Sequence, residues 1–69
     1  MSKEMEFFIF LIEQYACYKG ITADKVLKRW DELSLTDFVY DMYERYHVEA
    51  IENAFADIDK QMEKRENKC

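Results

Sequence analysis

The run Phe7-Phe8-Ile9-Phe10-Leu11-Ile12 is the stretch of sequence that decides the fold of this chain. It joins six large apolar residues without a charge among them, and a helix that carries it is apolar on nearly all sides. A span across a bilayer needs about 20 apolar residues, whereas this run is bounded by Glu6 and Glu13. We therefore predict a buried core helix that also has apolar surface to offer a partner.

The composition of the whole chain favours helices. The chain has 69 residues, nearly half of them hydrophobic, with Gly20 as its one glycine and no proline, so the usual residues of tight β turns are missing. A chain of this length builds a core that only marginally offsets the entropy of folding. We predict one all-α domain over residues 1–69, a small bundle of four helices at about 3–18, 23–32, 35–46 and 49–65, with a polar tail that frays from about residue 64.

The helix boundaries follow from capping residues and from the spacing of apolar residues. Gly20 is typical of a helix end, because glycine readily takes the left-handed conformation found there. Ser34 and Thr36 are rival caps for the third helix, and the sequence does not choose between them. We place a bend at His47, since a single helix through it would be unusually long for so small a domain. His47 is then interpreted as a boundary residue that bonds to the backbone.

No pattern in the sequence indicates catalysis, a metal site or a cofactor. Cys17 and Cys69 are far apart and His47 is the only histidine, so neither a metal-ligand spacing nor a Cys-His arrangement arises. Asp57 and Asp59 are two positions apart on a helix and should point about 200° apart, so they do not converge. We expect no enzyme activity, no cofactor, and a core position for Cys17. The opening residues lack the regions of a secretory signal, so we expect a cytoplasmic protein.

Acidic residues dominate the middle of the chain. The net charge is −5, and the segment from 31 to 59 holds nine carboxylates against Arg45 as its one fixed positive charge. Asp37, Asp41 and Glu44 follow spacings of four and three, which places them on one face of the predicted helix 35–46. Such a face favours a basic partner and repels phosphate, so the charge pattern argues against binding to nucleic acid.

The apolar run and the acidic face together predict a module for protein-protein interaction. The expected apolar anchors are Phe7, Phe10 and Tyr40, with the three carboxylates as the charges that meet the partner. The partner is either a second copy of the chain, in a homodimer, or a basic cognate protein, and no membrane is involved. The alternative is a small helix-turn-helix regulator built from helices 23–32 and 35–46, whose second helix would bring carboxylates against phosphate.

Aromatic and acidic landmarks are spread over nearly the whole chain. They are Phe8 and Ile12-Glu13-Gln14-Tyr15 in the first helix, Val26-Leu27 with Trp30 in the second, Asp37-Phe38-Val39-Tyr40 with Tyr43 and His47 in the third, and Asp57-Ile58-Asp59 in the last. Together they resemble a widespread family of short bacterial proteins known only as a domain of unknown function. Members often have a glycine-containing loop after the histidine, where this chain has Val48-Glu49-Ala50. Their genes are often found beside genes for ADP-ribosyltransferase-like proteins, so the resemblance implies an antidote to a toxin-like enzyme and supplies no catalytic residues.

Overall fold

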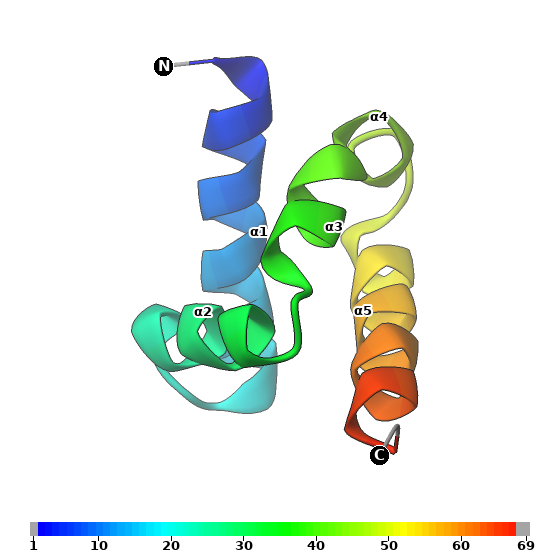
Figure 1. The fold of residues 1–69 in the computed structure, drawn as a ribbon. Helices are drawn as coiled ribbons and strands as arrows, with labels where there is room; N and C mark the ends of the chain where they lie inside the picture. Colours follow the sequence, from blue (N-terminus) through cyan, green and yellow to red (C-terminus); the bar gives the residue numbers. More distant parts are fainter. Residues whose placement is uncertain (1, 68–69) are drawn as a thin grey trace.

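The computed structural model describes residues 2–67 as helices joined by short turns. The helices are α1 (Lys3–Lys19), α2 (Ala23–Glu32), α3 (Thr36–Asp41), α4 (Tyr43–Tyr46) and α5 (Ile51–Glu66). In Figure 1, α1 and α5 stand at opposite sides, α3 lies between them, α4 lies above α5, and α2 crosses the lower end of α1. The prediction of a small all-α bundle is confirmed, since the described part of the chain contains no strand.

Helix α1 begins and ends where its sequence provides caps. The Ser2 hydroxyl accepts a hydrogen bond of 3.1 Å from the Met5 amide, which satisfies one of the free amides of the first turn. At the other end Gly20 has a φ of 71°, and the amide of Ile21 donates to the carbonyl of Ala16 over 3.0 Å. This left-handed turn is the helix end predicted at Gly20, and it leads the chain into α2.

Trp30 of α2 is the largest side chain of the core and is fully buried. Its ring packs against the rings of Phe8 and Tyr15 from α1, with centroids 6.0 and 5.6 Å away. Tyr15 also contacts Phe55 of α5, at a centroid distance of 5.7 Å. Three helices therefore meet around one group of rings. The buried residues are Leu11, Ile12, Tyr15, Ala16, Val26, Trp30, Leu35, Val39, Tyr46, Ala54, Phe55 and Ile58.

The third predicted helix, 35–46, is interrupted, and this corrects the prediction of four helices. Met42 leaves helical geometry at φ −85° and ψ 12°, and its amide bonds to the carbonyl of Val39, only three residues back, over 3.2 Å. This tighter turn ends α3 at Asp41 and starts α4 at Tyr43. Because Met42 packs against the core, apolar contact holds the chain in the bend.

Neither Ser34 nor Thr36 caps α3 with its side chain. Ser34 has a positive φ of 56°, and the amide of Leu35 donates to the carbonyl of Trp30 over 2.7 Å. Ser34 therefore ends α2 in the same way that Gly20 ends α1, although it is not a glycine. The Thr36 hydroxyl instead donates a hydrogen bond to a carboxylate oxygen of Asp31.

The break predicted near His47 is confirmed. Helix α4 ends at Tyr46, and α5 begins at Ile51, later than the predicted start at 49. Ala50 stands before α5 in an extended conformation with a ψ of 141°, and its carbonyl accepts the amide of Asn53 over 2.9 Å. The extended backbone at Ala50 marks the boundary, without a glycine or proline at that position.

Helix α5 extends to Glu66, beyond residue 64, where we predicted that the tail begins to fray. The Arg65 guanidinium donates hydrogen bonds to the carbonyl oxygens of Leu33 and Ser34, over 3.2 and 3.0 Å. Leu33 is the C-cap of α2 and Ser34 follows it in the turn, so neither carbonyl lies within the helix Ala23–Glu32. Arg65 thus fastens the last turn of α5 to the turn between α2 and α3.

Cys17 is exposed, so its predicted core position is wrong. It follows the buried Ala16 in α1, and one step along a helix turns a side chain by about 100°, here away from the core. Cys69 lies outside the described residues. Within residues 2–67, no helix combines the length and the apolar character that crossing a membrane requires.

Candidate interaction surface

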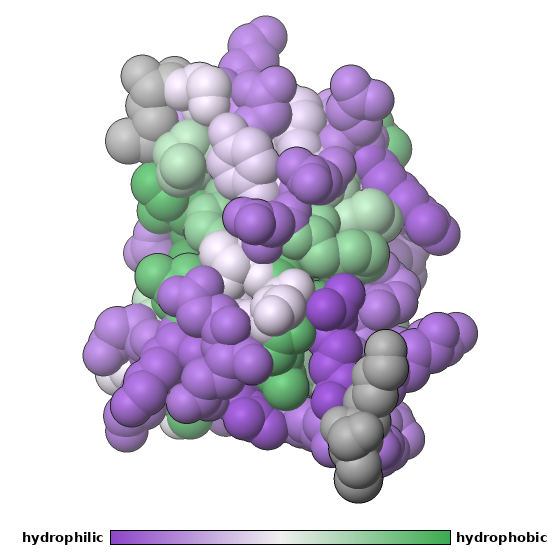
Figure 2. Space-filling model, in the orientation of Figure 1, coloured by the Kyte–Doolittle hydropathy of each residue, from purple (hydrophilic) through white to green (hydrophobic). Residues whose placement is uncertain are grey.

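Two phenylalanines of the opening run are left partly uncovered by the fold. Phe10 is 51% exposed and Phe7 is half-buried, whereas Leu11 beside them is fully buried. The rings of Phe7 and Phe10 are neighbours, with centroids 6.4 Å apart. Figure 2 shows apolar surface, in green, among polar side chains over the part of the molecule where α1, α3 and α4 lie. The domain therefore does not hide all of the apolar area of α1.

The segment around α4 adds two further rings to this part of the surface. Tyr43 meets Phe7 edge-on, with centroids 5.6 Å apart and an angle of 76° between the planes. The centroid of the His47 ring lies 6.4 Å from that of Phe7. His47 is also stacked on Tyr43, with centroids 4.3 Å apart and an angle of 2° between the ring planes. We call Phe7, Phe10, Tyr43 and His47 the aromatic surface. The sequence analysis did not include Tyr43 among the expected apolar anchors, although its four-residue spacing to His47 indicates a shared helix face.

His47 is held in place by two interactions. Its Nδ1 lies 2.7 Å from the carbonyl oxygen of Tyr43, at the end of α4. Because a carbonyl oxygen only accepts hydrogen bonds, the Nδ1 atom that faces it carries a proton. Stacking on the Tyr43 ring fixes the plane of the imidazole as well. The predicted role of His47 as a boundary residue bonded to the backbone is confirmed.

Tyr40, the third predicted apolar anchor, lies in a different group of rings. It is half-buried in α3 and packs on Phe8 with centroids 5.8 Å apart. Phe8 packs in turn on the buried Trp30. The structure therefore brings Phe7 and Phe10 together and associates Tyr40 with the edge of the core instead.

The three predicted carboxylates are all exposed, but they do not share one helix. Asp37 and Asp41 lie on α3, four residues apart, whereas Glu44 lies on α4 beyond the bend at Met42. The spacing argument that placed all three on one face therefore holds for Asp37 and Asp41 and fails for Glu44. Asp37 also lines a small polar depression with Asp31, at the turn between α2 and α3.

Other carboxylates lie closer to the aromatic surface along the chain. On α1, Glu6 is one turn before Phe10 and Glu13 is one turn after it, and all three side chains are exposed. Residues three and four apart on a helix are neighbours on its surface, so both carboxylates flank the Phe10 ring. Glu44 lies on α4, three residues before His47, and is also exposed. The aromatic surface thus has acidic neighbours on both of its sides.

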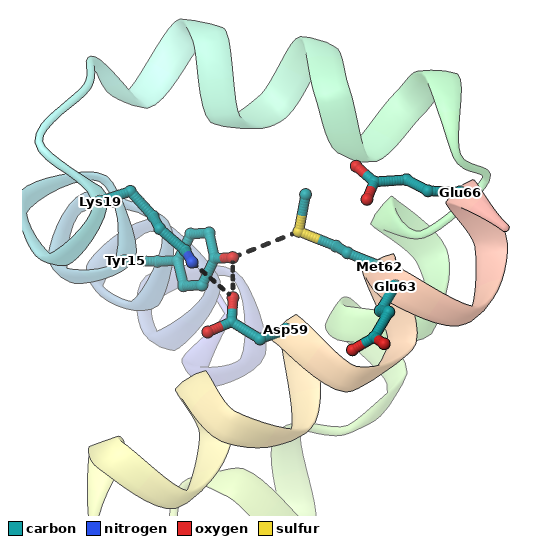
Figure 3. Close-up of a pocket in the computed structure, with 6 residues that line it drawn as sticks. All are labelled: Tyr15, Lys19, Asp59, Met62, Glu63 and Glu66. Carbon is teal, nitrogen blue, oxygen red and sulfur yellow. Dashed lines mark hydrogen bonds and ion pairs between the residues drawn. The ribbon is translucent and has the colours of Figure 1, made fainter.

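A second feature is an open notch between α1 and α5, which we call the polar notch. It is lined by Tyr15, Lys19, Asp59, Met62, Glu63 and Glu66. Figure 3 shows Tyr15 and Lys19 from α1 meeting Asp59 and Met62 from α5, with Glu66 further along α5. Asp59 is at its centre. The hydroxyls of Tyr15 and Tyr18 donate to its carboxylate, the second over 3.2 Å, and Lys19 Nζ lies 3.0 Å from Oδ1. Sequence reasoning missed this group, whose members come from segments about 40 residues apart.

The phenol at the centre of the notch is strongly perturbed. Burial raises the pKa of Tyr15 well above its ordinary value of 10.0, and the hydrogen bond to Asp59 raises it further. Tyr46 repeats this pairing at another place: burial and then the hydrogen bond of 2.5 Å to Asp57 raise its pKa. The prediction that Asp57 and Asp59 diverge is confirmed, because each carboxylate bonds a tyrosine of a different helix.

The charges of the polar notch are mostly paired inside the protein. Glu66 Oε2 lies 2.8 Å from Arg29 Nη2, and the pKa of Arg29 is raised by Glu66 first and then by Glu32. Lys19 is paired with Asp59 in the same way. Within residues 2–67, no three His, Cys, Asp or Glu side chains are placed to hold a metal ion. The notch therefore serves to tie α5 to α1 and α2.

The fold and its surfaces define a small all-helical domain with an aromatic surface flanked by carboxylates. The chain belongs to the family described as protein of unknown function (DUF3791), whose sequence model matches residues 6–65. The resemblance to a family of unknown function is thereby confirmed over nearly the whole chain. Comparisons with curated proteins and with solved structures gave no match.

Proposed function

We propose that this protein is a non-enzymatic protein-protein interaction module. The observation that supports this function is the aromatic surface, where Phe10 is 51% exposed and lies beside the half-buried Phe7. Aromatic side chains left in water on a small domain are typical of sites that another protein covers, because they give large contact area with little loss of conformational freedom.

The proposal extends to a biological role, which rests on the resemblance described above. The resemblance implies that genes for ADP-ribosyltransferase-like proteins lie beside those of related chains, so we propose an antitoxin-like partner that neutralises such an enzyme in the bacterial cytoplasm. Its net charge of −5 supports a basic partner, because opposite charges accelerate and orient the encounter of two proteins. Phe7 and Phe10 are the expected apolar anchors of that contact.

The test is to mix the purified chain with an ADP-ribosyltransferase-like protein, the kind of partner that the resemblance implies. We expect a stable complex in size-exclusion chromatography and a stoichiometric loss of ADP-ribosyl transfer when the chain is added. If a complex forms but ADP-ribosyl transfer continues, the chain is an interaction module and the proposal that it neutralises the enzyme is rejected. Full transfer with excess chain and no complex would reject both.

The helix-turn-helix alternative receives less support. Its recognition helix would be α3, which spans only Thr36–Asp41 and carries Asp37 and Asp41. A recognition helix has to lie along the major groove close to phosphates, which these carboxylates repel. A mobility-shift experiment at low salt that shows a retarded DNA complex would revive this alternative.

A further inference from the structure

We propose that the aromatic surface binds an apolar helix of the partner protein whose flanks carry lysine or arginine side chains. The inference rests on the proposed function and adds the place of contact and the chemistry of the occupant. The site consists of Phe7 and Phe10 from α1 and Tyr43 and His47 from the α4 segment, so an occupant would bridge two elements of the fold.

The rings are held in place before any partner arrives. Phe7 is fixed by edge contacts to Tyr43 and His47, each at an angle of 76° between the ring planes. His47 is fixed by its hydrogen bond of 2.7 Å to the Tyr43 carbonyl. Because these side chains have already lost much of their freedom, docking against them has a smaller entropy cost than docking against mobile side chains. The surface is thus prepared to receive apolar anchors.

The surrounding charges indicate what lies beside those anchors. Glu6 and Glu13 flank Phe10 on α1, and Glu44 lies three residues before His47 at α4. These carboxylates would attract lysine or arginine side chains on the flanks of an incoming apolar segment.

The positive charges of the same region do not cancel the carboxylates. Lys3 lies one turn before Phe7 on α1 and is the one lysine near the rings along that helix. Arg45 of α4 is engaged by Glu49, with Arg45 Nε 3.8 Å from Glu49 Oε1. The neighbourhood therefore stays net acidic.

A second copy of the chain is the poorer occupant. In a two-fold dimer the same patch faces itself, so Glu6, Glu13 and Glu44 would approach the carboxylates of the other copy. Like charges brought together across an interface oppose association. A partner with basic flanks avoids this cost and gains attraction instead.

A helix fits the site better than an extended strand. Strand addition needs an exposed sheet edge whose backbone groups can pair with the newcomer, and residues 2–67 form helices and turns only. An amphipathic helix instead offers apolar side chains three and four residues apart, which can contact rings from both α1 and α4. Lysines beside that apolar stripe would then face the carboxylates.

The experiment uses the labelled full chain and a designed peptide as the probe. The peptide is an amphipathic helix with leucines three and four residues apart and lysines on both flanks, and its twin carries glutamates in place of the lysines. We expect NMR shift changes centred on Phe7, Phe10, Tyr43 and His47 with the lysine peptide, and much weaker changes with the twin. Shifts centred on the polar notch, or equal binding of both peptides, would overturn the proposal.

Two pairs of variants separate anchor from charge. Phe10→Ala should weaken binding about tenfold, as loss of an anchor does. Ile21→Ala is its matched control, because Ile21 is 45% exposed and lies outside the aromatic surface, and it should leave binding unchanged.

The double change Glu6→Gln with Glu13→Gln tests the role of charge, and it should slow association several-fold at low salt and little at high salt. Equal slowing by Asp37→Asn with Asp41→Asn, which removes the same charge from α3, would argue against a local charge effect.

The results of these experiments show separately whether the proposed site and the proposed function are correct. If the chain neutralises an ADP-ribosyltransferase-like enzyme and Phe10→Ala leaves that complex unchanged, the proposed function holds and the proposed site is wrong. If the lysine peptide binds at the aromatic surface and no complex with the enzyme forms, the site stands and the neutralising role falls. A dimer in sedimentation that Phe10→Ala dissociates would show that a second copy occupies the surface, and would overturn the choice of a basic partner.

Discussion

The polar notch and the aromatic surface use aromatic residues in opposite ways. In the notch, Tyr15 is almost fully buried and donates its hydroxyl hydrogen to Asp59, so its apolar ring and its polar tip are both satisfied within the chain. On the aromatic surface, Phe10 has the Phe7 ring as a neighbour and keeps about half of its area in water. An aromatic residue with an internal acceptor supports the fold, whereas one covered only in part by other rings is available to a partner. The predictions below test this division of roles.

The largest expected effect is a loss of stability at alkaline pH that originates in the tyrosines bonded to carboxylates inside the protein. The pKa of Tyr15 is raised above 10.0 by burial first and then by Asp59, so the folded protein holds this proton more tightly than the unfolded chain does. Tyr46 behaves in the same way beside Asp57. Stability from these phenols is complete below pH 10 and falls as the pH rises further, because only the unfolded chain then gains from ionisation. Urea unfolding between about pH 8 and about pH 11 measures the loss.

Tyrosine-to-phenylalanine variants provide the control for this pH dependence. Tyr15→Phe and Tyr46→Phe each remove one late-titrating phenol, so each should flatten the fall in stability above pH 10. Ultraviolet titration of the folded protein should show the corresponding late increments disappear one at a time. An unchanged slope in the double variant would mean that other groups cause the alkaline loss.

The second largest effect is expected on removal of the Asp59 carboxylate, which accepts the hydrogen bond of the Tyr15 hydroxyl. Asp59→Ala leaves the buried Tyr15 hydroxyl without its carboxylate and also breaks the 3.0 Å contact with Lys19. Hydrogen bonds to a charged group contribute about 1.5–3 kcal/mol, so we expect destabilisation of that order in urea unfolding. Glu63→Ala is the matched control, because Glu63 lines the same notch on the same helix and is exposed. Equal effects of the two substitutions would contradict a structural role for Asp59.

The sequence predicted well what depends on local spacing. The second helix occurs at the predicted residues 23–32, and Gly20 ends α1 through the left-handed turn that only glycine adopts without strain. The divergence of Asp57 and Asp59 also follows from helical geometry alone. Apolar surface at Phe7 and Phe10 follows from a run that is wider than one helix face.

The features that the sequence missed depend on contacts between distant segments. In the sequence, Asp59 does not differ from the other polar residues of its helix. Its role depends on the hydrogen bond from Tyr15, which is 44 positions away in the chain. Arg65 looks like part of a charged tail until the carbonyls of Leu33 and Ser34 are brought within reach. The bend at Met42 contains no glycine or proline that would predict it, and Met42 packs against the core there. Spacing rules carry no information on such tertiary contacts.

On the aromatic surface we expect a much smaller effect on stability. Phe10→Ala removes a half-exposed ring and its contact with Phe7, so the free energy of unfolding should fall by no more than about 1 kcal/mol. Urea unfolding monitored by circular dichroism measures this change beside that of Asp59→Ala. A loss as large as that of Asp59→Ala would mean that Phe10 belongs to the core, and the contrast between the two regions would collapse.

The smallest expected effect concerns another contact inside the protein, the turn between α2 and α3 to which Arg65 is bonded. Ser34 has a φ of 56°, a conformation that costs a residue with a side chain about 1–2 kcal/mol and costs glycine very little. Ser34→Gly relieves this strain but gives the unfolded chain more freedom, so a net stabilisation of about 0.5 kcal/mol is expected. Gly20→Ala supplies the opposite case, because it places a Cβ at φ 71° and should destabilise by about 1 kcal/mol although nothing lies within 4 Å of that Cβ. If Ser34→Gly destabilises the protein instead, the serine side chain contributes more to stability than the backbone strain at Ser34 costs. The end of α2 would then be stabilised by Ser34 as well as by the guanidinium of Arg65.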